Sequence, residues 1–318
     1  MSVMRVYDWR TAATPDLDDA FAAEILRWHD MLGWDASESW QMVDAARRSG
    51  ALPGFVVEDA AGEVAGWTYY LRHGQELQIG ALNATNAQQT EALLDAILGS
   101  SLADEATSAV FFSFSTAADL ERLLTLRGFD TEKYLYLERS TAGVMRGAEG
   151  ASWRDSMSDA VAALLASSYV DARSRPFARD GGLDGWRHYV AQLVSTIGCG
   201  SFLPECCQLV EAEDGRVSAA VLTTRLSEQT AHLAQVVVDP LARGRSMGAR
   251  LVTAAMAAAH DSGFARATLL VGERNQAARR IYDELGFREV AAFVSATCDQ
   301  PRRLSSVALD TGGAITLR

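Results

Sequence analysis

Residues 232–251 read HLAQVVVDPLARGRSMGARL and contain, in order, a strand, a loop and the start of a helix. The run 232–238 is apolar and rich in valine, as expected of a central strand, and Asp239-Pro240 ends it. The loop that follows is basic and carries Gly244 and Gly248. Backbone N–H groups and the positive end of the helix dipole converge at such a place, which favours an anion. Without further context, a basic loop that only caps the helix would explain this stretch better than an anion-binding site.

Beyond this loop, the chain continues with alternating helices and strands. Alanine fills five of the six positions 254–259, which strongly favours a helix, and Gly263 is placed to end it. Residues 266–271 form the next predicted strand, Asn275 can cap the following helix, and residues 288–297 form a returning strand. The helix after Asn275 has an apolar face with the spacing i, i+3, i+4 and i+7, formed by Ala278, Ile281, Tyr282 and Leu285.

The loop resembles the acyl-CoA loop of the GNAT acyltransferase superfamily, which reads Gln/Arg-x-x-Gly-x-Gly/Ala after a Val-x-Pro strand end. Arg243 and Gly248 match the first and last motif positions, and Ser246 stands where the middle glycine is expected. A second family signature follows at the expected distance, formed by Asn275, Ala278, Tyr282 and then Leu285-Gly286-Phe287. The two signatures in order are far more specific than either alone, and the resemblance covers residues 153–297.

This resemblance implies an α+β fold, in which a mixed, mostly antiparallel sheet is flanked by helices. It also implies that acetyl-CoA is the acyl donor, that no metal is needed, and that the donor lies between two parted parallel strands with its pyrophosphate on the loop. The residues implied in donor binding are Val236, Val237, Val238, Arg243, Gly244, Arg245, Ser246, Met247, Gly248, Ala249, Asn275 and Ala278.

Two residues are candidates for catalysis. Tyr282 holds the family's position for the general acid, and a phenol with a pKa of about 10 is protonated at neutral pH. Its helical spacing suits a core tyrosine equally well. His232 opens the central strand, where some members of the family place a base, but an ordinary histidine at a strand end fits the same pattern. Asn275 is either a donor contact or simply the helix N-cap, and these roles are compatible.

An internal repeat sets the domain organisation. Residues 56–65 and 210–219 both read as a β-hairpin closed by glycine, and Gly62 and Gly215 are 153 residues apart. Gly128 and its counterpart Gly286 are 158 residues apart, so extra residues lie between the third strand and the next helix of the second copy. We therefore predict two domains, 1–142 and 148–318.

The first copy has lost the residues that carry chemistry. In the alignment of the two copies, Leu82-Asn83 corresponds to Val238-Asp239, and the following ATNAQQT contains neither arginine nor glycine. Leu124 stands at the position of Tyr282. We therefore expect one acyl-CoA per chain, bound to the second copy.

Two further segments are open to interpretation. Trp28, Trp34 and Trp40 are expected to pack in a core, with an aromatic rim of a substrate cleft as the alternative. Residues 173–188 form a predicted loop-like insert, and the resemblance implies that this region lines the acceptor pocket.

Composition limits the classes of function. The 318 residues carry a net charge of −12, which disfavours nucleic acid and anionic membranes as partners. There is no apolar run near the roughly 20 residues of a membrane span, nor the apolar core of a signal peptide. The four cysteines lack zinc spacing. The near-absence of lysine beside many arginines suggests a bacterial genome rich in G and C. We expect a cytoplasmic monomer or homodimer.

These observations together predict a tandem GNAT protein with one active domain. The expected reaction is direct acetyl transfer from acetyl-CoA to a primary amine of a small molecule. Two alternatives stay open: an N-acetyltransferase that acts on proteins or peptides, and a non-catalytic sensor that binds acyl-CoA.

Overall fold

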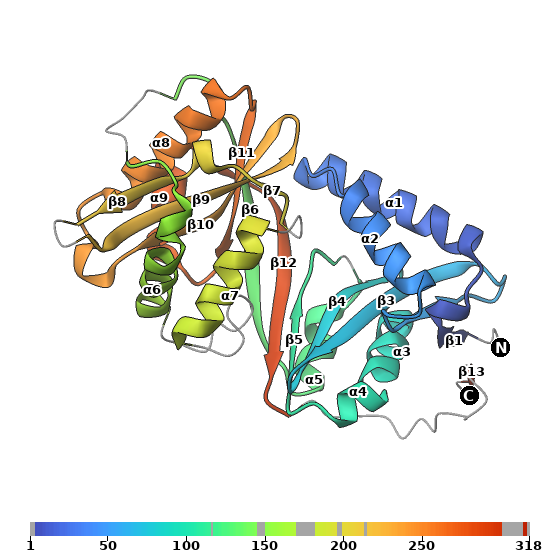
Figure 1. The fold of residues 1–318 in the computed structure, drawn as a ribbon. Helices are drawn as coiled ribbons and strands as arrows, with labels where there is room; N and C mark the ends of the chain where they lie inside the picture. The colour runs from blue at the N-terminus through green and yellow to red at the C-terminus, as the bar shows by residue number, and fades with distance from the viewer. Residues whose placement is uncertain are drawn as a thin grey trace. The chain divides into compact units, whose positions relative to one another are not determined.

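The computed structural model describes residues 4–115, 117–144, 150–169, 182–195, 199–212, 215–300 and 314–316. The chain divides into two compact units, each built from a sheet with helices, as the predicted α+β class requires (Figure 1). Unit 1 contains the described residues of Met1–Leu26, Ser37–Lys133 and Phe293–Arg318. Unit 2 contains those of Arg27–Ala36 and Tyr134–Ala292.

The sheet of unit 1 has the strand order β13-β1-β2-β3-β4-β5-β12. Its strands are β1 (Arg5–Asp8), β2 (Gly54–Glu58), β3 (Val64–His73), β4 (Glu76–Ala84), β5 (Ser108–Phe112), the end of β12 (Arg288–Cys298) and β13 (Ala314–Thr316). Its helices are the first part of α1 (Thr14–Leu32), α2 (Ser37–Arg48), α3 (Ala87–Leu98), α4 (Ser101–Asp104) and α5 (Leu120–Leu126). β4 and β5 are parallel, and the other neighbouring strands are antiparallel.

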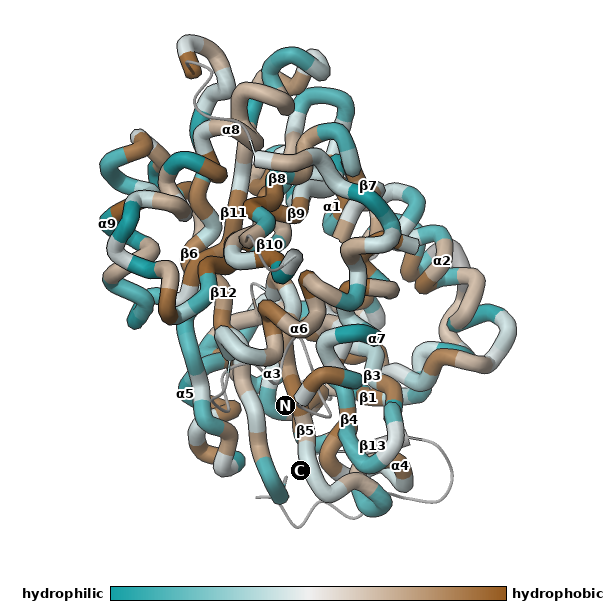
Figure 2. The backbone as a smooth tube through the Cα atoms, turned by 60° about the vertical axis from the view of Figure 1, so that its left-hand side comes forward, coloured by the Kyte–Doolittle hydropathy of each residue, from teal (hydrophilic) through white to brown (hydrophobic). Residues whose placement is uncertain are grey.

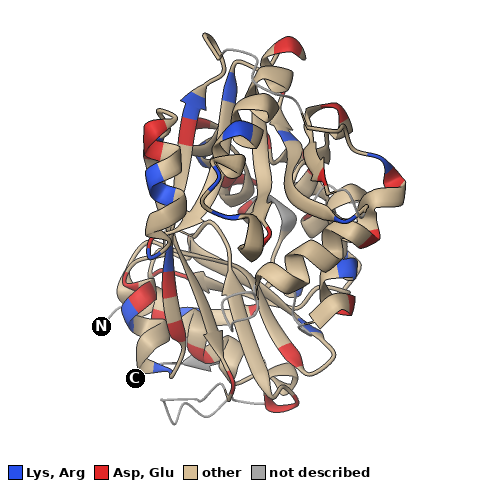
Figure 3. Cartoon of the chain, turned by 90° about the vertical axis from the view of Figure 1, so that its left-hand side faces the viewer, with Lys and Arg blue, Asp and Glu red and all other residues tan. Residues whose placement is uncertain are grey.

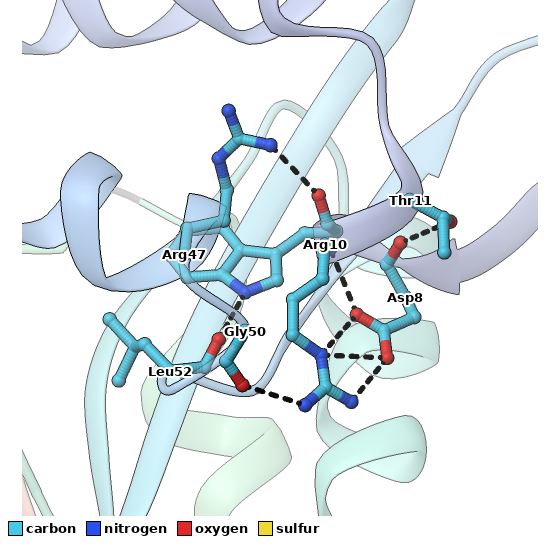
Figure 4. Close-up of polar contacts among 7 residues, drawn as sticks. Asp8, Arg10, Thr11, Arg47, Gly50 and Leu52 are labelled. Carbon is cyan, nitrogen blue, oxygen red and sulfur yellow. Dashed lines mark hydrogen bonds and ion pairs between the residues drawn. The ribbon is translucent and has the colours of Figure 1, made fainter.

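Aromatic residues fill one side of the unit 1 sheet. The ring of Trp9 stacks on those of Trp67 and Tyr69, and Trp40 packs edge-on against Trp67. Figure 4 shows polar contacts beside these rings, where Arg10 binds the Asp8 carboxylate with two nitrogens. The Trp9 indole donates to the Leu52 carbonyl at 2.8 Å. Core packing is therefore confirmed for Trp40, and also for the buried Trp34 of unit 2.

A buried ion pair joins two helices of unit 1. The Arg127 guanidinium, which is fully buried, donates to the Asp95 carboxylate of α3 at 2.6 Å and to the Leu123 carbonyl of α5 at 3.1 Å. Leu285 holds the corresponding position in the second repeat, just before Gly286. Unit 1 therefore fixes α5 to α3 with charge where the second repeat has an apolar side chain.

The sheet of unit 2 has the order β6-β11-β10-β9-β7, and β8 pairs with β9. Its strands are most of β6 (Asp130–Ser140), β7 (Ser201–Phe202), β8 (Gln208–Glu211), β9 (Val217–Ser227), β10 (Thr230–Val238), β11 (Arg266–Gly272) and the start of β12. Its main helices are α6 (Ser158–Ser168), α7 (Gly182–Ser195), α8 (Met247–Asp261) and α9 (Gln276–Glu284). Only β10 and β11 pair in parallel among the registers described for this unit.

The two faces of the unit 2 sheet carry separate cores. On one face, Val161, Trp186 and Val190 of α6 and α7 pack against the strands. On the other face, α8 and α9 pack with side chains that include Leu251 and Tyr282. Figure 2 shows the strands of this sheet as largely hydrophobic, as expected when both faces are covered.

The repeats exchange their last strands. β6 ends the first repeat, yet it pairs along the whole of β11 in unit 2. β12 ends the second repeat, and its residues Ser295–Cys298 pair with β5 in unit 1. The predicted domains 1–142 and 148–318 thus describe the repeats along the chain, whereas the compact units divide the chain differently.

The repeat itself is visible in the backbone. Both predicted hairpins are present, and their glycines, Gly62 and Gly215, have φ of 83° and 80°. Strand registers align Glu76 with Thr230, so Ala84 corresponds to Val238, and the alignment of Leu82-Asn83 was wrong by two residues. Residues 85–86 connect β4 to α3, whereas residues 239–246 connect β10 to α8. The extra residues therefore lie in the predicted loop.

Two findings apply to the described residues alone. None of the helices there is long and apolar enough to cross a membrane. No group of three His, Cys, Asp or Glu side chains there is arranged to hold a metal ion. Acidic and basic residues are interspersed on the face drawn in Figure 3.

Candidate functional site

The parallel strands β10 and β11 pair only at their beginnings. Their register runs from Thr230 with Arg266 to Leu233 with Leu269. Beyond that point β10 continues beside β9, and β11 continues beside β6. We call the opening between residues 234–238 and 270–272 the strand gap. Main-chain groups that face a gap between strands lack ladder partners, so an extended ligand can bind them.

A β-bulge lies where β10 and β11 begin to part, at the closed end of the strand gap. Leu233 pairs with Thr223 and Gln235 pairs with Leu222, so Ala234 is the extra residue in β10. A bulge turns a strand locally and brings a side chain to a new direction. Here the side chain that follows the bulge is that of Gln235, the single polar residue between Leu233 and Val238.

The basic loop folds back against the end of β10. Asp239 accepts a hydrogen bond from the Leu241 backbone N–H at 2.8 Å, and the Arg243 guanidinium donates to the Val238 carbonyl at 3.2 Å. Gly244 has φ of 78°, a conformation that favours glycine. Arg243 and Arg245 remain exposed, so their charges are available to a ligand.

Ser246 adopts the conformation expected of the glycine it replaces. Its φ is 56° and its ψ is 16°, in the left-handed region, immediately before α8. Its side chain makes no capping hydrogen bond, so the N–H groups of Met247, Gly248 and Ala249 are not satisfied by a cap. A Cβ added to Gly248 would meet Val238 Cγ2 at 3.6 Å, an ordinary contact.

These features fit a diphosphate. The first turn of α8 offers backbone donors and the positive end of a helix, and two exposed arginines lie in the preceding loop. Along β10, the strand gap ends directly before this loop. The arrangement suits a ligand with an extended chain that ends in a phosphate group.

We expect Ser246→Gly to stabilise the protein by up to roughly 1 kcal/mol. A non-glycine residue in the left-handed region costs about 1–2 kcal/mol, and the greater freedom of glycine in the unfolded chain offsets part of the gain. Urea denaturation measures the change. Ser246→Ala keeps the strain and loses no capping bond, so it serves as the control and is expected to give no gain. A less stable glycine variant would show that the serine side chain supports the loop.

Tyr282 lies on α9, and Asn275 directly precedes this helix. Asn275 Oδ1 accepts a hydrogen bond from the Ala278 backbone N–H at 3.2 Å, which confirms the N-cap role. Tyr282 is 6% exposed and packs edge-on against Phe287. Burial, with a smaller effect of Tyr169, raises the pKa of the Tyr282 phenol well above its usual value. Tyr282 is therefore a core residue that stays protonated at neutral pH, and its role as an acid stays a prediction.

His232 lies where β10 and β11 are still paired. It is 3% exposed, its Nδ1 lies 2.9 Å from Thr268 Oγ1, and its ring stacks on Tyr136. Burial lowers the pKa of His232 to about 4, so the imidazole is neutral at pH 7. These surroundings match the ordinary buried histidine that the sequence also allowed. The role of His232 as a base stays a prediction.

Sequence reasoning missed a polar network at the strand gap. Gln235 Nε2 donates to the Tyr189 hydroxyl of α7 at 2.8 Å, and the Tyr169 hydroxyl donates to Gln235 Oε1 at 3.5 Å. We call these three residues the Gln235 network. A lone glutamine inside HLAQVVV was the available signal. Residues 182–188 belong to helix α7, so the predicted loop is wrong there, and 173–181 lie outside the described residues.

Unit 1 lacks a comparable anion site in the part of the chain that the structure describes. Its helix α3 starts with a capping box, in which Asn86 Oδ1 accepts from the Gln89 N–H and Gln89 Oε1 accepts from the Asn86 N–H. These side chains already satisfy the helix start. At the bulge in β4, a Cβ on Gly80 would lie 2.0 Å from the Tyr69 ring, so the ring packs directly on the backbone.

Comparison with known proteins agrees with this geometry. The family model described as Acetyltransferase (GNAT) family matches residues 161–287. No curated protein matches the chain at a significant level. The matched range contains both the basic loop and Tyr282.

Solved structures show the same fold at low sequence identity. A GCN5-related N-acetyltransferase from Sphaerobacter thermophilus has a TM-score of 0.56 and 14% identity, over 78% of this chain and 81% of that one. A tandem GNAT protein from the clavulanic acid biosynthesis pathway has a TM-score of 0.53 and 17% identity, over 79% and 84%. A GNAT-family acetyltransferase from Colwellia psychrerythraea has a TM-score of 0.52 and 15% identity, over 92% and 98%.

Proposed function

Residues 161–287 form a GNAT acetyltransferase domain, and from this premise we propose that the protein transfers an acetyl group from acetyl-CoA to a primary amine of a small molecule. The observation that supports the donor is the strand gap followed by the loop 243–246 and the uncapped start of α8. The family uses acetyl-CoA, which supplies a thioester as the reactive group. The loop and helix start would hold its pyrophosphate, and the backbone of residues 236–238 would bind its extended arm.

The chain's own residues have separate roles in this reaction. The acceptor nitrogen bonds to the acetyl carbon as the carbon–sulfur bond breaks, and the nitrogen gives up a proton. Tyr282, which stays protonated, would donate a proton to the departing sulfur. Water is the simplest acceptor for the amine proton, because His232 is buried in the paired part of the strands.

The helices α6 and α7, which pack over the strand gap, favour a small acceptor. Gln235 is 5% exposed and is bonded to Tyr169, which directly follows α6, and to Tyr189 of α7, and the core of these helices packs on this face of the sheet. Such cover limits the room for a long peptide. A protein or peptide N-acetyltransferase would need a more open groove at the same place.

Donor binding is tested by two substitutions in the loop. Arg243→Gln removes one exposed charge and is expected to weaken CoA binding by about tenfold, the lower end for a charged hydrogen bond. Gly248→Val adds a branched side chain that faces Val238, between the start of α8 and the strand gap, and is expected to weaken binding at least as much. Calorimetric titration with CoA measures both. Arg122→Gln, an exposed position on α5 of unit 1, is the matched control.

The reaction itself is tested by offering acetyl-CoA and a panel of amines, with mass spectrometry to detect the acetylated products. Product from small amines supports the proposal. Product from peptides alone would make the protein a peptide N-acetyltransferase. CoA binding without any product would make it a sensor.

A further inference from the structure

The strand gap brings together phenols from both faces of the sheet. Tyr282 belongs to the core on the face of α8 and α9, whereas Tyr169 packs with the core on the face of α6 and α7. Continuous strands would separate such residues, because a sheet keeps its two faces apart. Tyr169 nevertheless lies close enough to Tyr282 to contribute to its raised pKa. The Tyr169 hydroxyl is bonded to Gln235, which follows the bulge in β10, so Tyr169 lies beside the place where β10 and β11 have parted.

Gln235 connects this place to two helices. The bulge at Ala234 precedes it in β10, and its amide is bonded to Tyr169 at the end of α6 and to Tyr189 on α7. Burial raises the pKa of the Tyr189 phenol, so this partner stays neutral and keeps its hydrogen. Stacking of Tyr169 on Trp186 further limits where its hydroxyl can lie. In the structure the amide is oriented with Nε2 toward Tyr189 and Oε1 toward Tyr169.

That orientation has a consequence for Tyr169. Gln235 donates a hydrogen bond from Nε2 to the Tyr189 hydroxyl, so its Oε1 faces the Tyr169 hydroxyl. In this orientation the Tyr169 hydroxyl donates its hydrogen to Gln235, so toward any other polar group its oxygen acts as an acceptor. A phenol oxygen held in this way can accept an N–H of an amine, which leaves the nitrogen lone pair for attack on a carbonyl carbon.

We propose that Gln235 is a positioning residue for acetyl transfer, which acts by fixing the Tyr169 hydroxyl so that Tyr169 binds and orients the acceptor amine at the strand gap. This inference rests on the proposed function and adds the recognition of the amine to it. The two phenols then have different roles, because Tyr282 serves the departing sulfur and Tyr169 serves the attacking nitrogen.

The test is a double-mutant cycle with Gln235→Met and Tyr169→Phe, using the amine that the wild-type protein acetylates. Each single variant is expected to lower kcat/KM for the amine by about 10- to 100-fold, as misplaced reacting groups do. Because Gln235 acts through Tyr169, the double variant should lose little more than either single one. The KM for acetyl-CoA and the slow hydrolysis of acetyl-CoA without amine should change less than about twofold, since the donor is assigned to the loop and to the backbone of residues 236–238, and the Gln235 side chain is bonded to Tyr169 and Tyr189 instead.

A structural role is distinguished by a control of matched burial. Thr223→Val removes a buried hydroxyl that donates to the Cys206 carbonyl at 3.1 Å in the same sheet. It is expected to lower Tm without lowering kcat/KM for the amine. A Gln235→Met protein with a lower Tm but an unchanged kcat/KM for the amine would overturn the positioning role. Additive losses of kcat/KM in the double-mutant cycle would overturn it too. A wild-type chain inactive on every amine would remove the proposed function, and this role with it.

Discussion

Replacing Tyr282 by phenylalanine is expected to lower kcat by about 100-fold while the affinity for CoA changes little. The ring stays in its core beside Phe287, so only the hydroxyl is lost. General acid catalysis by a placed side chain contributes typically about 10²- to 10⁴-fold, and water can replace part of a lost donor. Steady-state kinetics at saturating acetyl-CoA measure kcat, and calorimetry measures the affinity. An unchanged kcat would leave Tyr282 as a core residue only.

The pH dependence separates Tyr282 from His232. Burial raises the pKa of Tyr282, so its phenol keeps the donated proton to alkaline pH and causes no fall in kcat below about pH 9. Burial lowers the pKa of His232 to about 4, so the imidazole is already neutral above about pH 5. His232→Gln is therefore expected to leave the kcat/KM profile unaltered between about pH 6 and 9. A lost acid limb in that range would make His232 the base after all.

The local features of the site could be predicted from the sequence because local residues determine them. Strand β10, the loop and α8 follow from an apolar run, Asp239-Pro240, and an alanine-rich helix. The Asn275 cap lies where the helix periodicity begins, and Gly263, predicted to end the alanine-rich helix, has a φ of 91°. Each of these signals depends on residues within about one helical turn of one another.

The features that were missed depend on distant partners. The sequence of β6 has the pattern of polar and apolar residues expected of a half-buried strand. This pattern does not determine whether the strand pairs with β5 or with β11. Nothing local in Gln235 shows that Tyr169 and Tyr189 meet its amide, because these residues lie 66 and 46 positions away along the chain. The helix at 182–188 was missed because its two glycines and its charges resemble a loop, whereas Trp186 and Val190 bury its inner face.

The second repeat alone, residues 148–318, is expected to be insoluble or unable to bind CoA. This fragment lacks β6, which pairs with β11 from Gly272 opposite Tyr134 to Arg266 opposite Ser140. β11 forms one wall of the strand gap, and without β6 its backbone becomes an open edge. Leu135 and Leu137 also leave the core that contains Tyr282. An unpaired edge beside exposed apolar surface favours aggregation.

The same fragment loses a second support. The end of α1 belongs to unit 2, where the Tyr136 hydroxyl donates to the Leu32 carbonyl at 2.8 Å and the Asp35 N–H donates to the Leu226 carbonyl at 2.8 Å. Both groups of contacts come from residues before 148. The fragment 148–318 therefore lacks a strand and a helix end that belong to unit 2 itself, in addition to unit 1.

Co-expression of 1–142 with 148–318 as two chains provides the decisive control, because it breaks the chain but keeps β6. We expect the two pieces to purify together and to bind one CoA per pair, since β6 can still pair with β11 and Ser295–Cys298 can still pair with β5. Size-exclusion chromatography and equilibrium dialysis measure these properties. A soluble 148–318 fragment that binds CoA alone would show that β11 does not need β6. Pieces that fail to associate would show that the exchanged strands hold together only within a continuous chain.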